Sequence, residues 1–217
     1  MRRPATGTTG GPAPIEYEPG LVEDAVRWGI EQGGLGIESL KLQRLRFDHR
    51  RKLDALYRLP EGDQREAAFR NHFATMFTEL GNAEWIPRWL ELFPRLRSEL
   101  ECIVVRAAAG PGEEGAELWE NQEQRGEGIP AYLVITVSGT GLRDHDELRA
   151  VLLPDLLRAA DLLDPDFGFR HGDLKSDTRG SEERIRAVYQ RLWELSARAR
   201  LQARGLREDD RLLADSE

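Results

Sequence analysis

The chain has 217 residues, of which 40% are hydrophobic and 32% charged, a balance typical of a globular protein. Its net charge of −8 excludes a general nucleic-acid binder, because neutralising phosphates requires a basic surface. The single cysteine, Cys102, excludes an internal disulfide, and no apolar run approaches the roughly 18 residues of a membrane span. With no apolar centre of a secretory signal near its start, the sequence predicts a cytoplasmic protein that binds neither nucleic acid nor membrane.

The first 20 residues are rich in Gly, Pro and Thr, and we expect residues 1–20 to form a flexible leader in which Ile15 and Tyr17 are able to dock. Apolar residues at helical spacing then predict a short helix over residues 21–32, ended by Gly33 and Gly34.

Two longer helices are expected next, over about residues 38–59 and from Asp63 to Gly81, joined by a short loop as an antiparallel hairpin. Asp63 and Glu66 have the spacing of a reciprocal N-terminal cap. Each apolar stripe carries one histidine, His49 and His72. Because no third ligand lies at a nearby helical step, we expect these histidines to hydrogen-bond at the edge of a core rather than to bind a metal.

Residues 82–97 place Trp85, Trp89 and Phe93 at four-residue intervals, which predicts a helix with Pro87 in its first turn, closed by Pro94, whose aromatic stripe is core or a lid over a groove. The pattern then changes. Residues 101–108 and 131–137 are β-branched runs of strand length, and residues 116–120 favour a third strand. We expect the two main strands to be neighbours in a small antiparallel or mixed sheet.

The most apolar helix is expected to begin at His145, after an Asp144 and Glu147 cap. Apolar residues cover most of its circumference, so we expect it to be buried. A proline within it should remove one backbone hydrogen bond and kink the axis. One proline and three charged residues interrupt the apolar surface of this helix. They are spaced three or four residues apart and so lie on one side: Pro154, Asp155, Arg158 and Asp161.

The run LRAVLLPDLLRAADLLDPDFGF, residues 148–169, resembles LRxxLxHELxHxxDMLDPxFGY, a pattern of small zincin-like metallopeptidases of bacterial origin. The resemblance implies that Pro154 and Arg158 occupy the positions of two histidine ligands and that Asp155 occupies the position of the glutamate base. Asp161 is then at the position of a further carboxylate. It also implies a minimal zincin-like α+β fold, in which an edge strand beside this helix receives the substrate as an added strand.

This chain departs from the pattern at the residues that carry the chemistry. Proline offers no donor to a metal, and arginine cannot be deprotonated to become one. The sequence therefore predicts a catalytically inactive homologue without metal or cofactor, which serves as a binding or structural module and could hold a peptide or protein along its sheet edge. A guanidinium at Arg158, bracketed by Asp155 and Asp161, would replace the positive charge of the lost ion.

Two other functions remain open from the residues alone. One is an active zinc-dependent hydrolase with a non-standard ligand set, drawn from Asp155, Asp161 and His171 in the loop 164–180. The other is a helical scaffold without any site. A last helix is expected from Ser181 to Gly205, followed by a polar tail. We thus expect one α+β domain over residues 21–206, composed of a helical part (21–97) and a sheet with central and C-terminal helices (98–206), and a tail over 207–217; the oligomeric state is left open.

Overall fold

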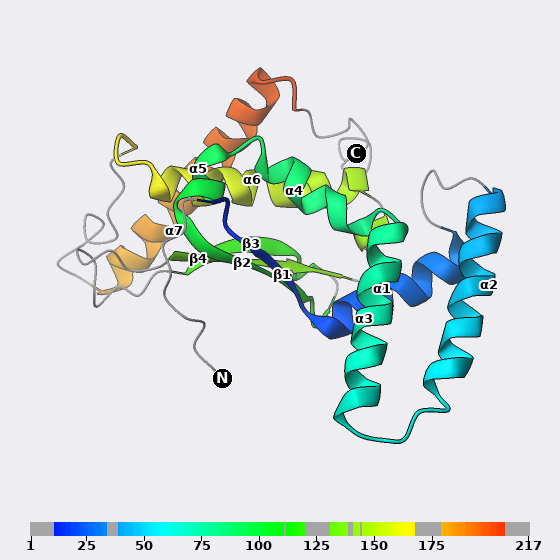
Figure 1. Ribbon diagram of the computed structural model, residues 1–217. Coiled ribbons are helices and arrows are strands. Elements are labelled where there is room, and N and C mark those ends of the chain that lie inside the picture. The colour runs from blue at the N-terminus through cyan, green and yellow to red at the C-terminus, as the bar shows by residue number, and fades with distance from the viewer. Residues whose placement is uncertain are drawn as a thin grey trace.

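The computed structural model describes residues 11–33, 39–110, 112–119, 131–138, 141–143, 145–167 and 179–206. Within them the chain has a mixed α+β architecture, which confirms the predicted fold class. A four-stranded sheet forms the centre, helices cover one of its faces, and a lobe of three helices lies to one side (Figure 1). The helices are α1 (Pro19–Gln32), α2 (Ser39–Leu56), α3 (Asp63–Glu79), α4 (Trp85–Leu90), α5 (Pro94–Ser98), α6 (His145–Leu163) and α7 (Arg179–Ala203). The strands are β1 (Ile15–Tyr17), β2 (Leu100–Ala107), β3 (Gly115–Trp119) and β4 (Ala131–Val137).

The strand order is β1-β2-β4-β3. The first three are parallel to one another, and β3 runs antiparallel to β4 at the edge. The two main strands are neighbours as predicted, with Ile103 of β2 opposite Leu133 of β4. Leu133 also faces Leu118 of β3, so the three strands share one apolar row. The predicted strands agree with the observed ones to within one or two residues.

Strand β1 corrects the expectation of a flexible leader over residues 1–20. Ile15–Tyr17 pair with β2, and the Ile103 N–H donates to the Pro14 carbonyl at 2.9 Å. The Tyr17 ring packs against Phe77 of α3, with ring centroids 5.0 Å apart. A Gly- and Pro-rich composition cannot reveal a partner strand that follows much later in the chain. Residues 1–10 lie outside the described part.

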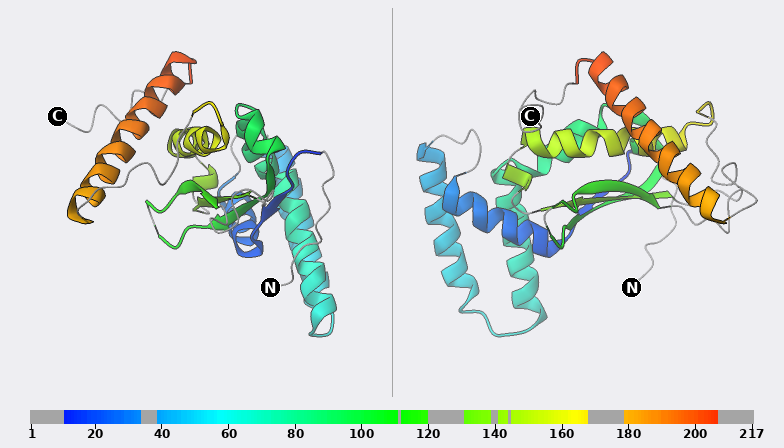
Figure 2. Two further views of the ribbon diagram at one scale, coloured as in Figure 1. Left: turned by 90° about the vertical axis from the view of Figure 1, so that its left-hand side faces the viewer. Right: turned by 180° about the vertical axis from the view of Figure 1, so that it is seen from behind.

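The covered face of the sheet shows strict alternation. In β4, residues 131, 133, 135 and 137 are buried, and the residues between them are only half-buried. This period of two places one set of side chains against the helices. Helices α4, α5 and α6 lie over this face, and α7 crosses on the outer side of α6 (Figure 2). Helix α6 is therefore buried between the sheet and α7, as its apolar circumference predicted.

The helix predicted within residues 82–97 and closed by Pro94 is shorter than expected, and the helix that begins at Pro94 was not predicted. The chain forms a 3-10 turn at Asn82–Glu84, then α4, then α5. Phe93 has φ −131° and ψ 71°, because the residue before a proline is disfavoured in the helical region, and Pro94 begins α5. The core role of the aromatic stripe is nevertheless confirmed for Trp89 and Phe93, which are buried. Trp85 is half-buried and stacks on His145 with ring centroids 3.6 Å apart.

Helices α2 and α3 form the predicted hairpin, but the cap of α3 differs. Gly62 is the N-cap, at φ 137°, and no side chain caps the helix. Asp63 is therefore the first helical residue rather than the cap. With Glu66 it still places negative charge in the first turn, where the helix dipole favours it.

Candidate functional site

The polar positions of the central helix lie on α6, which runs without interruption from His145 to Leu163. Pro154 is buried inside this helix and does not restart it. Helix α6 packs along β3, the edge strand of the sheet, so the expected proximity of helix and sheet edge is observed.

Asp155 connects α6 to the edge strand. Its Oδ2 accepts a hydrogen bond from the backbone N–H of Ala116 in β3, at 3.0 Å. The preceding strand residue is Gly115, and a Cβ atom there would lie 2.9 Å from the same carboxylate oxygen. Glycine therefore permits this close approach of helix and strand. The carboxylate at the position of the general base acts here as an acceptor for a backbone amide.

Arg158 pairs with Asp155. Its guanidinium donates to Asp155 Oδ1, one turn earlier on the same helix face. The side chain of Asp155 is 19% exposed and that of Arg158 is 32% exposed, so solvent reaches this pair in part. The Asp155 carboxylate thus binds both the guanidinium of Arg158 and the backbone amide of Ala116.

Asp161 does not pair with Arg158, although the sequence predicted that Arg158 would lie between Asp155 and Asp161. Its carboxylate turns to α7 instead, where Arg200 donates to both oxygens, with 2.8 Å between Nη1 and Oδ1. The indole Nε1 of Trp193 also donates to Oδ2, at 2.8 Å. Asp161 is buried, and its hydrogen bond raises the pKa of Arg200. The tertiary partner is favoured because its contact is bidentate and because the Asp161 carboxylate is buried.

Arg200 and Trp193 were not among the site residues predicted from the sequence. They lie seven residues apart on one face of α7, together with the buried Ala197, and this spacing was available in the sequence. A more apolar stripe lies on another face of α7, and that stripe rather than the face of Trp193 and Arg200 was predicted to pack. His171, predicted as a further site residue, lies outside the described residues, and so do Asp173 and Asp177.

The residues at the positions that the resemblance assigns to metal ligands do not fit a metal ion. Pro154 has no donor atom, and the guanidinium of Arg158 is always protonated. Asp161 is engaged by Arg200 and Trp193, and Asp155 by Arg158 and the strand. Within the described part of the chain, no three His, Cys, Asp or Glu side chains gather closely enough to hold a metal ion.

The two histidines of the helical hairpin lie together, as expected for the edge of a core. His72 Nε2 and His49 Nδ1 are 3.0 Å apart, and the rings stack with an interplanar angle of 23°. Burial lowers the pKa of both imidazoles. Arg27 lowers the pKa of His49 further, and His49 and Lys52 do the same for His72. Two neutral rings therefore share one hydrogen bond, in which one nitrogen donates and the other accepts.

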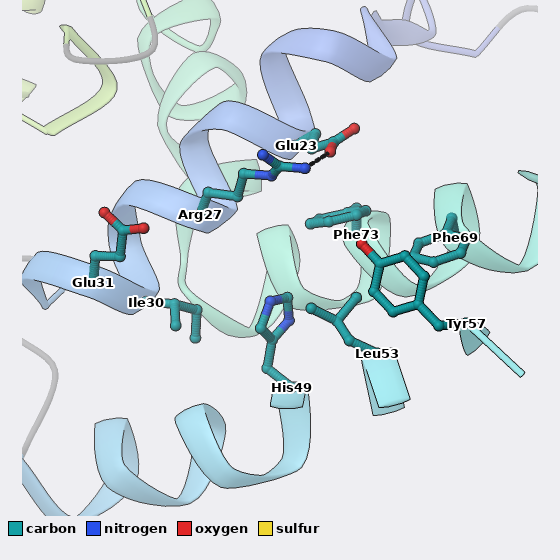
Figure 3. Close-up of a pocket in the computed structure, with 9 residues that line it drawn as sticks. All are labelled: Glu23, Arg27, Ile30, Glu31, His49, Leu53, Tyr57, Phe69 and Phe73. Carbon is teal, nitrogen blue, oxygen red and sulfur yellow. Dashed lines mark hydrogen bonds and ion pairs between the residues drawn. The ribbon is translucent and has the colours of Figure 1, made fainter. Parts of the chain in front are cut away.

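A cavity of about 400 Å³ lies beside His49, between α1, α2 and α3 (Figure 3). Its volume is within the range of small-molecule pockets, about 300–1,000 Å³. The ion pair of Arg27 and Glu23 runs along one side. The cavity belongs to the helical lobe and shares no lining residue with the polar positions of α6. Its other lining residues are Ile30, Glu31, Leu53, Tyr57, Phe69 and Phe73.

Comparisons with protein-family models, with curated proteins and with solved structures find no match to this chain. Among the described residues, no helix has both the length and the apolar character needed to cross a membrane.

Proposed function

We propose that this protein is a zincin-like binding module without peptidase activity, which holds an extended peptide along the free edge of strand β3. The observation that carries the proposal is the hydrogen bond from the Ala116 amide to Asp155, because it joins the base position of the helix to the edge strand. An edge strand beside a central helix is the arrangement that the resemblance implies. A cytoplasmic location forms part of the proposal.

The loss of hydrolysis follows from side-chain chemistry. A zinc hydrolase needs about three protein ligands and a bound water whose pKa the metal lowers to about 7. Pro154 and Arg158 occupy two of the implied ligand positions and supply no lone pair for a metal. Asp161, which the alternative of a non-standard zinc site requires, is committed to Arg200. These contacts favour the binding module over an active hydrolase.

The edge of β3 offers backbone groups to a peptide. Antiparallel pairs alternate, so when the Ala116 N–H points away from β4, the backbone groups of Leu118 point away as well. Asp155 already accepts from Ala116, and within the described residues nothing else pairs with the Ala116 carbonyl or with either backbone group of Leu118, so these can receive an added strand. Main-chain hydrogen bonds of this kind give affinity with little dependence on sequence.

Amide hydrogen exchange tests the proposal directly. In the free protein we expect the Leu118 amide to exchange much faster than those of Glu117 and Trp119, which face β4. Peptides selected from a random display library should then slow exchange at Leu118. Protection in the hairpin α2 and α3 instead would contradict the proposal.

Metal analysis distinguishes the proposed binding module from the alternative of an active zinc hydrolase. Protein purified without added metal should contain zinc well below one equivalent, and zinc added to it should not raise its melting temperature. Stoichiometric zinc after purification would instead favour the hydrolase.

A further inference from the structure

The cavity beside His49 is lined by two kinds of side chain. Apolar side chains come from all three helices of the lobe: Ile30, Leu53, Phe69 and Phe73. Among the polar lining residues His49 is the most deeply buried, at 7% exposure, whereas Arg27 and Tyr57 are largely exposed. A small molecule in this space would therefore bury its hydrocarbon part and still meet polar groups that orient it.

His49 has one ring nitrogen to offer to a ligand. Its Nδ1 is engaged with Nε2 of His72, and its own Nε2 forms no hydrogen bond within the described part of the chain. When Nδ1 accepts from His72, the proton of the neutral His49 ring is on Nε2. When His49 is protonated, Nδ1 donates to His72 and Nε2 carries a proton as well. In both forms His49, which lines the cavity, has an N–H for an acceptor there.

Two further donors lie beside the same space. Arg27 uses Nη2 for its ion pair with Glu23, one turn earlier on α1. Because this pair is exposed it is weak, and the rest of the guanidinium can bind another acceptor. Tyr57 turns its hydroxyl towards Phe73, and among the described residues this hydroxyl has no hydrogen-bond partner (Figure 3). The same view shows Arg27, Tyr57 and His49 on different sides of the Phe73 ring.

The charge that acts on the histidine pair is positive. Burial is the main cause that lowers the pKa of His49, and Arg27 lowers it further. Lys52 acts in the same direction on His72. The carboxylate of Glu31 is turned away from His49, so a ligand beside this ring meets the charge of Arg27 instead (Figure 3). The charged or titratable groups around the pair and the cavity are Glu23, Arg27 and Glu31 on α1, Arg46 and Lys52 on α2, and His72 on α3.

We propose that this cavity binds a small carboxylic acid with an apolar body, such as an aryl-alkanoate. The carboxylate accepts from the guanidinium of Arg27 and from Nε2 of His49, and the hydroxyl of Tyr57 is a third donor for it. The hydrocarbon part packs against the apolar side chains that line the cavity. An amine of the same shape would face Arg27, and like charges repel each other. The cavity is separate from the edge of β3, so the proposal does not rest on peptide binding.

Three ligands of nearly equal size test this chemistry: phenylacetate, phenylacetamide and phenethylamine. In a chemical-shift titration of the full chain we expect phenylacetate to saturate one site with a dissociation constant of about 1 mM or less, as about ten heavy atoms allow. The amide should bind about tenfold more weakly, because its oxygen is not charged. Shift changes should centre on His49, Leu53 and Phe73. Absence of saturable phenylacetate binding, or an amine that binds as tightly, would overturn the proposal.

Arg27→Met tests the cation. Methionine keeps an apolar stem but removes the charge, so the affinity for phenylacetate should fall by about tenfold. Arg88→Met is the matched control, since the Arg88 side chain is 59% exposed and pairs with Glu84 one turn earlier, as Arg27 pairs with Glu23. The control should bind phenylacetate like the unaltered chain, and both variants should keep the circular dichroism spectrum. Unchanged phenylacetate affinity in Arg27→Met would contradict the assignment.

Protonation of His49 makes binding depend on pH. A carboxylate beside the ring favours the imidazolium, so the affinity for phenylacetate should rise about threefold or more as the pH falls from about 7.5 to about 6. Calorimetry in two buffers of different ionisation enthalpy should then show proton uptake. Phenylacetamide should show neither effect. A phenylacetate affinity that is the same at both pH values would place the carboxylate away from His49 and so overturn the proposal.

Discussion

The carboxylate of Asp155 accepts a hydrogen bond from the backbone N–H of Ala116, 39 residues earlier in the chain, and so fastens the central helix to the edge of the sheet. The same carboxylate pairs with Arg158. One side chain therefore accepts from a half-buried strand amide that points away from β4 and balances a cation on its own helix.

Replacing Asp155 with alanine removes the acceptor of a half-buried amide. We expect the free energy of unfolding to fall by about 1–3 kcal/mol, the usual cost of leaving such a donor unpaired. Asp155→Asn keeps an acceptor oxygen and should cost less. Urea denaturation of both variants measures the difference, and equal losses would mean that the charge rather than the hydrogen bond is what matters.

Arg158→Met tests whether the guanidinium stabilises α6 by replacing a metal charge. Because the pair with Asp155 is partly exposed, we expect the free energy of unfolding to change by less than about 1 kcal/mol. Methionine retains the apolar stem that packs on the helix. A loss of several kcal/mol in thermal or urea unfolding would show instead that the cation is structurally required.

Asp161→Leu should be among the more damaging substitutions, because it leaves Arg200 and Trp193 without their acceptor. We expect a loss of about 3 kcal/mol, at the lower end for a broken buried pair since Arg200 is 34% exposed. Adding Arg200→Met should recover part of this loss in a double-mutant cycle. Asp48→Asn, which breaks an exposed pair with Arg51, serves as the control and should cost under about 0.5 kcal/mol.

The histidine pair makes stability depend on pH. The folded state lowers the pKa of His49 and His72 below 6.5, so below that pH the unfolded chain binds protons that the folded chain does not. Stability is complete above about pH 6.5 and falls as the solution becomes more acidic. The urea midpoint should therefore drop between about pH 7.5 and pH 5.5, before most carboxylates titrate. His72→Gln should flatten this slope, and a slope that His72→Gln leaves unchanged would contradict the assignment to the histidine pair.

Tyr17 provides a spectroscopic test of strand β1. Burial raises its pKa to about 12, so its phenol should ionise later than an ordinary tyrosine in an absorbance titration. Tyr17→Phe should remove this late component and keep the packing on Phe77. Because the folded state raises the pKa, the contribution of Tyr17 to stability is lost as the pH rises above about 10. Ionisation of all tyrosines near pH 10 would contradict a docked β1.

The sequence predicted best those elements whose cause is local. The bounds of β4 match the predicted run of residues 131–137, since alternating β-branched residues require no knowledge of their neighbours. The hairpin of α2 and α3 was likewise predictable, because its stripes and its loop lie within one continuous segment.

Elements that depend on distant partners could not be predicted in the same way. Strand β1 forms because it pairs with Ile103 and its neighbours in β2. Its own composition, taken alone, favours a loop. Asp161 had two possible cations, and only the three-dimensional arrangement selects Arg200 over Arg158. The end of the helix before Pro94 was predicted from the proline, but the aromatic spacing gave no sign that a second short helix, α5, begins there.

The pairing of Ile15 with Ile103 also has a consequence for the order of events during synthesis. When the first strand leaves the ribosome, the strand that receives it has not yet been translated, and the hairpin of α2 and α3 can close on its own nearby contacts well before. Ile15–Tyr17 therefore stay unpaired until β2 has been translated, and the sheet can close only after that.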